Sequence, residues 1–246
     1  MMKKVCSVKS SNFNSKNHII FICDHASNNI DKKYRTQFVN TKILDSHVAY
    51  DIGAKSLTLN LTKKLKQSCI YSNFSRLLID PNRKKTDKDS IISTIFDTSI
   101  PINNNIEKKE KDLRVKNFFN IYHNKISKLI NNKQKRYEKI FLVSIHSFTK
   151  KHHTFNRGVE VGLLWNKNMN LLLYIQKKLS DDGIHYGRNY PYSGFHYNYT
   201  LDKHSKNGLI DNIAIEIRND LINNIKGINK YTKLFSKIFK ELINGR

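Results

Sequence analysis

The sequence predicts an α/β protein with one large domain. Short apolar runs alternate along the chain with longer stretches whose apolar residues recur at helical spacing, which is the pattern of a domain built from strands and helices in turn. A chain of 246 residues suits a single α/β domain, and neither an internal repeat nor a long low-complexity linker divides it. We therefore expect one domain over residues 1–246, with residues 1–16 as a poorly ordered N-terminal extension.

The expected strands are short apolar runs, and the expected helices are longer periodic stretches. The clearest strand is Ile140–His146, whose sequence IFLVSIH is almost wholly apolar. The other expected strands are His18–Cys23, Val159–Trp165, Ile213–Ile217 and a pair around Cys69–Tyr71 and Arg76–Asp80. The expected helices are Asp51–Gln67, Glu107–Asn132, Asn170–Leu179 and the tail Leu221–Leu242.

The net charge of +24 raises the question of an anionic partner. A basic nucleic-acid-binding protein is one interpretation, and it would place arginine, lysine and aromatic residues on a common surface. Here the excess is nearly all lysine, spread along the whole chain, which is typical of an ordinary solvated surface. We therefore expect no nucleic-acid partner, and we expect the positive field to steer a small anionic substrate.

The sequence favours a cytoplasmic protein with no membrane partner. No apolar run approaches the roughly 18 residues that span a bilayer. The segment MMKKVCSVKSSNFNSKN has charged residues but lacks the apolar region of a signal peptide. The cysteines Cys6, Cys23 and Cys69 are odd in number and lack metal-ligand spacing, so we expect neither a disulfide framework nor a cysteine metal site.

Two histidines stand at the ends of expected strands. His25 follows the first strand in CDHASN, and His146 closes another in VSIHSFT. A single histidine in such a place is more often structural, but two at the same edge of a sheet indicate a metal site, because neutral imidazole is a common zinc ligand. Catalytic zinc sites usually have three protein ligands, and we expect a carboxylate as the third.

Glu216 lies between two isoleucines in an expected strand. A glutamate in an apolar strand costs free energy unless it is paired or functional. One interpretation is an ion pair with Arg218, which lies two residues on and shares its face of the strand. The other is a general base that activates water at a metal ion.

The turn IDPNR follows another apolar run and carries Asn82 and Arg83, with Arg76 a little upstream. Arginine offers a planar fork that binds carboxylates through two hydrogen bonds. In a chain whose cations are mostly lysine, clustered arginines suggest that this geometry matters. A structural pair between an arginine and Asp80 is the alternative.

Taken together, these segments resemble the N-formylglutamate amidohydrolase family. The matching pieces are DHASN, HVAYDIGA, SRLLIDPNR, VSIHSFT, RGVEVGLLW, NYPYSG and IEIRNDLI, in family order from about residue 20 to residue 225. The same order of motifs also looks like the zinc carboxypeptidase superfamily. The resemblance implies a three-layer α/β/α sandwich with a mixed, mostly parallel sheet. It also implies zinc-dependent release of formate from a small anionic N-formyl amino acid such as N-formyl-L-glutamate, or, alternatively, a related deacylase or carboxypeptidase activity.

By this resemblance, His25 and His146 bind zinc, Asn82 and Arg83 hold a substrate carboxylate, and Glu216 is the catalytic base.

The third zinc ligand departs from the carboxypeptidase pattern. Those enzymes carry a glutamate three residues after the first histidine, where this chain has Asn28, a poor zinc ligand. Asp51 in HVAYDIGA is our first choice for the missing carboxylate, and Asp24 is the second. The alternative role for Asp51 is the N-cap of the following helix.

The remaining assignments concern the substrate. Arg76 is expected to stabilise the oxyanion. Arg218 or Arg188 is expected to meet a side-chain carboxylate, and His204 is expected to handle a proton or a hydrogen bond. The segment GRNYPYSG has Arg188 and Tyr190 where the family usually has acids, which leaves the identity of the substrate open.

Overall fold

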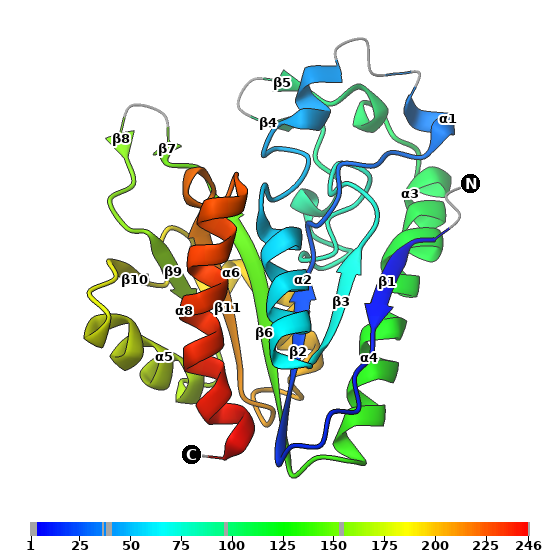
Figure 1. Cartoon of the computed structure of the whole chain (residues 1–246). Helices are drawn as coiled ribbons and strands as arrows, with labels where there is room; N and C mark the ends of the chain where they lie inside the picture. The colour runs from blue at the N-terminus through cyan, green and yellow to red at the C-terminus, as the bar shows by residue number, and fades with distance from the viewer. Residues whose placement is uncertain (1–3, 36, 38–40, 96–97, 153–154, 246) are drawn as a thin grey trace.

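The protein is a three-layer α/β/α sandwich built on one seven-stranded sheet (Figure 1). The computed structural model describes residues 4–35, 37, 41–95, 98–152 and 155–245. The strand order is β1-β3-β2-β6-β11-β9-β10, with β1 and β9 antiparallel to the neighbours β3 and β11 and the other pairs parallel. The predicted fold class, a three-layer sandwich with a mixed and mostly parallel sheet between helical layers, is therefore confirmed.

The strands of the main sheet are short to medium in length. They are β1 (Cys6–Lys9), β2 (Asn17–Cys23), β3 (Ser68–Ser72), β6 (Lys139–Phe148), β9 (Val161–Leu164), β10 (Tyr186–Arg188) and β11 (Asn212–Arg218). Two small hairpins lie outside it, β4 (Thr94–Ile95) with β5 (Thr98–Ser99) and β7 (Lys151–His152) with β8 (Phe155–Asn156).

The helices cover both faces of the sheet. They are α1 (Lys32–Arg35), α2 (Ala54–Leu65), α3 (Lys108–Arg114), α4 (Asn120–Gln134), α5 (Asn170–Asp181), α6 (Gly194–Tyr197), α7 (Tyr199–His204) and α8 (Ile225–Asn244). One face packs against α2, α5 and α8, and α2 lies beside α8 in Figure 1. The other face packs against α4, α7 and the long loops that follow β2 and β3.

The central strand β2 shows why the sheet needs cover on both sides. Its side chains alternate between two cores: Ile19, Phe21 and Cys23 pack with α2 and α8, and Ile20 and Ile22 pack on the other side. All five are inaccessible to solvent. A continuous apolar run of this kind is typical of a parallel strand that is buried on both faces.

Two segments differ from the expectation. Part of the predicted N-terminal extension is regular, because Cys6–Lys9 forms the edge strand β1 against β3. The run Arg76–Asp80 is not a strand: the Leu78 amide bonds the Ser75 carbonyl in a turn, and the Asp80 amide bonds the Ser90 carbonyl. Its apolar side chains are nevertheless fully buried, which explains why hydrophobicity alone predicted a strand.

The long helix predicted over Glu107–Asn132 is present in three consecutive pieces. The helices α3 and α4 are joined without a break by one wider helical turn, Val115–Phe119. None of the helices in the described part of the chain is long and apolar enough to cross a membrane. The three cysteines are buried and free.

The buried His18 makes the stability of the fold sensitive to acid. Its ring is fully buried, lies 2.8 Å from the Ser68 hydroxyl and stacks on Tyr137. Burial, with the nearby charges of Lys133 and Arg136, lowers the pKa of His18 from 6.5 to about 3. The folded protein therefore keeps His18 neutral at pH values where the unfolded chain takes up a proton.

We expect the neutral His18 to cost no stability above about pH 6.5. Between pH 6.5 and about pH 3, protonation of His18 in the unfolded chain should lower the folding equilibrium constant by roughly tenfold for each pH unit. The measurement is urea unfolding of the wild type and of His18→Gln at pH 7 and pH 5. The variant should lose less stability over this interval than the wild type. Equal losses would show that His18 does not titrate on unfolding.

Candidate metal centre and active site

A cavity of about 730 Å³ lies at the end of the sheet where β2, β6 and β11 finish. This is the edge at which ligands bind in open α/β sheets. Most of the residues that the sequence singled out line this one cavity. They are His25, Asp51, Arg76, Asn82, Arg83, His146 and Glu216.

The sheet delivers the histidines and the glutamate directly. His25 follows the end of β2, while His146 and Glu216 stand side by side in the parallel pair β6–β11. Ile215 and Ile217, the neighbours of Glu216, pack into the core beneath α2 and α8. Because side chains alternate along a strand, the Glu216 carboxyl lies on the opposite face, toward the cavity.

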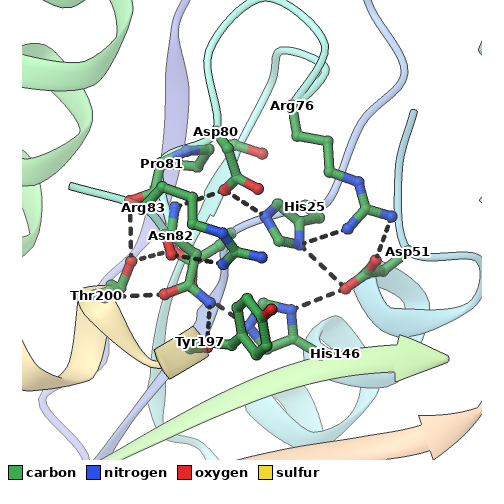
Figure 2. Close-up of polar contacts among 12 residues, drawn as sticks. His25, Asp51, Arg76, Asp80, Pro81, Asn82, Arg83, His146, Tyr197 and Thr200 are labelled. Atoms are coloured by element: carbon green, nitrogen blue, oxygen red, sulfur yellow. Dashed lines mark hydrogen bonds and ion pairs between the residues drawn. The ribbon is translucent and has the colours of Figure 1, made fainter. Parts of the chain in front are cut away.

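The two imidazoles converge on one carboxylate (Figure 2). The Nδ1 atoms of His25 and His146 lie 3.4 Å and 2.8 Å from Oδ2 of Asp51. One ligand atom from each of the three residues lies within 4.8 Å of the other two. Zinc bound tetrahedrally at about 2.1 Å requires ligand atoms about 3.4 Å apart, so a small shift of these atoms is enough to admit the ion.

The other nitrogen of each ring faces a second buried aspartate. Nε2 of His25 lies 2.8 Å from Asp80, and Nε2 of His146 lies 3.4 Å from Asp24 and 3.0 Å from the Ser144 hydroxyl. Metal-binding histidines usually donate the N–H of the second nitrogen to a carboxylate, which fixes the tautomer and the ring orientation. Both histidines have this arrangement, with the Nδ1 atoms turned toward the common centre.

Electrostatics fits a cation at this centre. Burial alone would lower the pKa of His146, but hydrogen bonds to Asp24 and Asp51 raise it well above its ordinary value. Burial would likewise lower the pKa of His25, and the charges of Asp80 and Asp51 raise it. The carboxylates thus hold positive charge on this cluster, and a metal ion bound by neutral imidazoles would supply the same charge.

The pKa values of the three aspartates are shifted in the opposite direction, below their ordinary value. Burial would raise the pKa of Asp51, but the charges of Arg76 and His25 hold it well below its ordinary value. The same balance holds for Asp24, whose hydrogen bond to His146 outweighs burial, and for Asp80, where the charges of His25 and Arg83 do so. All three aspartates are therefore ionised at neutral pH.

Asp51 is fixed by the turn that precedes α2. Its amide donates to the His25 carbonyl over 2.8 Å, and the helix begins only at Ala54, so Asp51 does not cap it. Gly53 is the residue before the helix, with φ of +82°, and a Cβ there would lie 2.2 Å from the Ile222 carbonyl oxygen. Only glycine combines the positive φ with the absence of a Cβ, which explains the glycine in the DIGA sequence.

Arg76 lies against this cluster. Its Nη2 is 3.2 Å from Oδ1 of Asp51, and its Nη1 is 3.3 Å from Nδ1 of His25. The Val48 and His47 carbonyls accept further hydrogen bonds from the same guanidinium. Arg76 is thereby held beside the His25–Asp51–His146 group.

Glu216 differs from the three aspartates around the two histidines in having neither a hydrogen bond nor an ion pair among the described residues. Its Oε2 is buried and accepts no hydrogen bond within the described residues. Burial raises its pKa from 4.5 to about 7, with a smaller opposing effect of the His146 charge. The ion pair with Arg218 does not form, because that guanidinium binds Asp220 at 2.8 Å. An unpaired carboxyl whose pKa lies near neutrality suits a general base.

The IDPNR turn presents one arginine to the cavity. The Asn82 side chain is bound to backbone: its Nδ2 donates to the Tyr197 carbonyl, and its Oδ1 accepts from the Thr200 amide. Arg83 donates to the Asn82 carbonyl and lies over the Tyr197 ring at 4.6 Å. Asp80, the acid of the same turn, pairs with His25. Asn82 thus anchors the turn, and Arg83 keeps donors free for an anion.

Three residues that were expected to bind the substrate do not line the cavity, namely Arg188, Arg218 and His204. Arg218 lies at the end of β11 and is occupied by Asp220. His204 lies in α7, where its Nε2 is 2.9 Å from Nδ1 of His123, and His123 in turn bonds the Pro81 carbonyl. His204 therefore supports the IDPNR turn from behind. The positions of Arg218 and His204 relative to the cavity could not be inferred from their places in the sequence near the ends of predicted elements.

Other residues at the site were missed by the sequence reasoning. Asp24 was considered only as a possible zinc ligand, and Asp80 only as the partner of an arginine. Each of them follows an apolar run, as the two histidines do, and this pattern could have indicated a place at the site. Arg157, Tyr192 and Tyr197 also line the cavity. Arg157 and Tyr192 lie in loops and Tyr197 ends the short helix α6, so none of them stands at the end of a predicted strand.

The comparison with protein families decides the identity. The model of the N-formylglutamate amidohydrolase family matches residues 17–223, which is most of the chain and includes every residue of the site described above. The chain belongs to this family. A search of curated proteins found no match to this N-formylglutamate amidohydrolase family member.

Solved structures share the fold of this chain. A gene product of Agrobacterium tumefaciens, Atu2144, is 28% identical, with a TM-score of 0.91 over 98% of this chain and 96% of its own. An N-formylglutamate amidohydrolase from Ralstonia eutropha JMP134 is 13% identical, with a TM-score of 0.76 over 97% of each chain. A bacteriophage poly-gamma-glutamate hydrolase, 12% identical over 100% of this chain and 93% of its own, has a TM-score of 0.51. At these identities the last two show a shared fold.

Proposed function

We propose that this N-formylglutamate amidohydrolase family member is a zinc-dependent hydrolase that releases formate from an N-formyl acidic amino acid such as N-formyl-L-glutamate. The observation that carries the proposal is the unpaired, buried Glu216 beside the His25–Asp51–His146 group in one cavity. The outer carboxylates and the short distances to Asp51 support a metal site, and a set of two imidazoles and one carboxylate is a donor set that zinc accepts.

In this proposal His25, Asp51 and His146 would hold the zinc ion. A zinc ion bound there would supply a Lewis acid that lowers the pKa of water and polarises the formyl carbonyl. Glu216 removes the proton from the attacking water, whose oxygen forms a bond to the formyl carbon. As the C–N bond breaks, Glu216 returns that proton to the leaving amine, so formate and the free amino acid are produced.

The arginines supply charge where the substrate is negative. Arg76 has Nη1 and Nη2 beside the metal centre, and it is the donor placed to stabilise the oxyanion that forms from the formyl carbonyl. Arg83 is placed to bind the α-carboxylate, with Asn82 holding its backbone in position. Binding both ends of the reacting unit fixes the formyl carbon near Glu216.

A substrate comparison tests the proposal. Purified zinc-loaded protein is incubated with N-formyl-L-glutamate, N-acetyl-L-glutamate, N-succinyl-L-glutamate and a dipeptide that ends in glutamate, and the release of free amino acid is measured. We expect the highest kcat/KM for N-formyl-L-glutamate. A higher value for another acyl group or for the peptide would assign the enzyme to a related deacylase or carboxypeptidase class, and hydrolysis of none would contradict the proposal.

A further inference from the structure

Arg157 is a buried arginine without an acidic partner. Only 4% of the residue is exposed, and no carboxylate among the described residues lies within ion-pair distance of its guanidinium. Its Nη1 donates to the carbonyl and the hydroxyl of Thr149 and toward the Tyr192 hydroxyl, over 3.1 to 3.4 Å. Nε and Nη2 make no hydrogen bond within the described part of the chain.

The other deeply buried arginine of this protein shows what a structural arginine looks like. Arg114 is 1% exposed and forms an ion pair with Glu110 at 3.0 Å. Both of its terminal nitrogens also donate, to the Leu78 and Ile102 carbonyls and to the Asn103 side chain. Burying a guanidinium is costly unless charge and donors are matched. Arg114 meets this condition and Arg157 does not.

Arg157 and Arg83 both line the cavity, each beside a tyrosine ring. The guanidinium carbon of Arg157 lies 5.1 Å from the centroid of the Tyr192 ring, as that of Arg83 lies 4.6 Å from Tyr197. The two tyrosine rings contact each other edge to face at 6.0 Å. All four side chains line the cavity. A pair of tyrosines thus separates two arginines that share one binding space.

We propose that Arg157 binds the side-chain carboxylate of the substrate and so selects an acidic amino acid. The inference rests on the proposed function, in which Arg83 takes the α-carboxylate. It replaces Arg218 in this role, because Arg218 is occupied by Asp220. A ligand with two carboxylates places one negative charge against each arginine, and the free Nε and Nη2 of Arg157 form the planar pair of donors that a carboxylate accepts.

Selection by such a group is strong, because an uncharged analogue leaves the arginine buried without its anion. The test measures kcat/KM for N-formyl-L-glutamate and N-formyl-L-glutamine with the wild type, Arg157→Gln, Arg157→Lys and Arg136→Gln. Arg136 is exposed and lies between α4 and the start of β6, whereas the cavity lies where β6 ends. Arg136→Gln therefore removes one positive charge at a site far from the cavity.

We expect Arg157→Gln to reduce the preference for glutamate, measured as the ratio of kcat/KM for N-formyl-L-glutamate to that for N-formyl-L-glutamine, by roughly 10- to 100-fold. Most of this change should be a higher KM for N-formyl-L-glutamate. Arg157→Lys should keep part of the preference, because it keeps the charge without the planar fork. Arg136→Gln should keep all of it. A loss of activity toward both substrates in equal proportion in the Arg157 variants would assign Arg157 a structural role and overturn the inference.

A binding measurement separates this inference from the proposed reaction. Calorimetric titration with glutarate, and with its monoamide as the singly charged control, requires no hydrolysis. The wild type should bind glutarate more tightly than the monoamide, and Arg157→Gln should bind the two alike. If that result appears without formate release, the inference stands and the proposed reaction fails. If formate is released but glutarate binding is the same in wild type and Arg157→Gln, the inference fails.

Discussion

Replacing Glu216 by glutamine is expected to lower kcat for formate release by about 10²- to 10⁴-fold, which is the usual contribution of a general base. The amide has nearly the shape of the carboxyl but cannot accept the proton of water. Because no described residue hydrogen-bonds Oε2 of Glu216, the substitution breaks no contact there, and the fold should persist. The measurement is kcat at saturating N-formyl-L-glutamate, with circular dichroism and zinc content as controls.

The same carboxyl predicts the pH dependence. Glu216 must be ionised to act as a base, and burial raises its pKa to about 7 in the absence of a metal ion. A cation beside it favours the ionised form and lowers that value. We therefore expect kcat/KM to fall as the pH drops through an apparent pKa at or below about 7. Glu216→Gln should lose this acid limb, and a limb that is unchanged in the variant would assign it to another group.

Replacing Asp51 by asparagine is expected to weaken zinc binding by more than 100-fold and to abolish formate release at stoichiometric zinc. Even changes to partners of metal ligands cost 10- to 100-fold in affinity or activity, and Asp51 is the carboxylate on which both histidines converge. The change also leaves the Arg76 guanidinium without its acidic partner. The measurement is a zinc titration in competition with a chromophoric chelator.

A matched control for Asp51 lies a few residues away. Asp45 is exposed and accepts a hydrogen bond from Asn28, so Asp45→Asn removes the same charge from the same loop without touching the cavity. It should bind zinc as the wild type does. If Asp51→Asn also retains wild-type affinity, Asp51 is not a ligand, and Asp24, which faces Nε2 of His146, becomes the candidate.

Residues at the ends of strands were predictable because local pattern determines where they lie. A continuous apolar run followed by a polar residue places that residue at the edge of the sheet, which is how His25 and His146 were assigned to one place. Glu216 follows the same logic, since a lone acid in a buried strand must face a site or a partner. The register of β6 against β11 then sets it beside His146.

Pairings between distant loops were not predictable in this way. Arg218 shares a strand face with Glu216, so the local pattern allowed an ion pair, but the chain turns directly after β11 and brings Asp220 closer. Arg157 opens the segment RGVEVGLLW and follows only the two-residue strand β8, so no predicted strand indicated a role for it. Its significance depends on the absence of an acidic partner, which only the folded arrangement of the loops reveals.

The Arg76–Asp80 segment shows that a hydrophobic pattern does not always predict backbone conformation. Its leucines and isoleucine are as buried as those of a strand, yet the backbone forms a turn that aims Arg76 at Asp51 and Asp80 at His25. Hydrophobicity reports burial and not backbone pairing, so a buried loop and a short strand give the same signal. The loop geometry is what places both side chains at the centre.

The most direct test is formate release from N-formyl-L-glutamate by protein stripped of metal with a chelator and then titrated with zinc. We expect no activity in the stripped protein and a linear recovery that ends at one zinc ion per chain, and we expect His146→Ala not to recover. Full activity in the stripped protein, or recovery that is the same in His146→Ala, would contradict the metal centre formed by His25, Asp51 and His146.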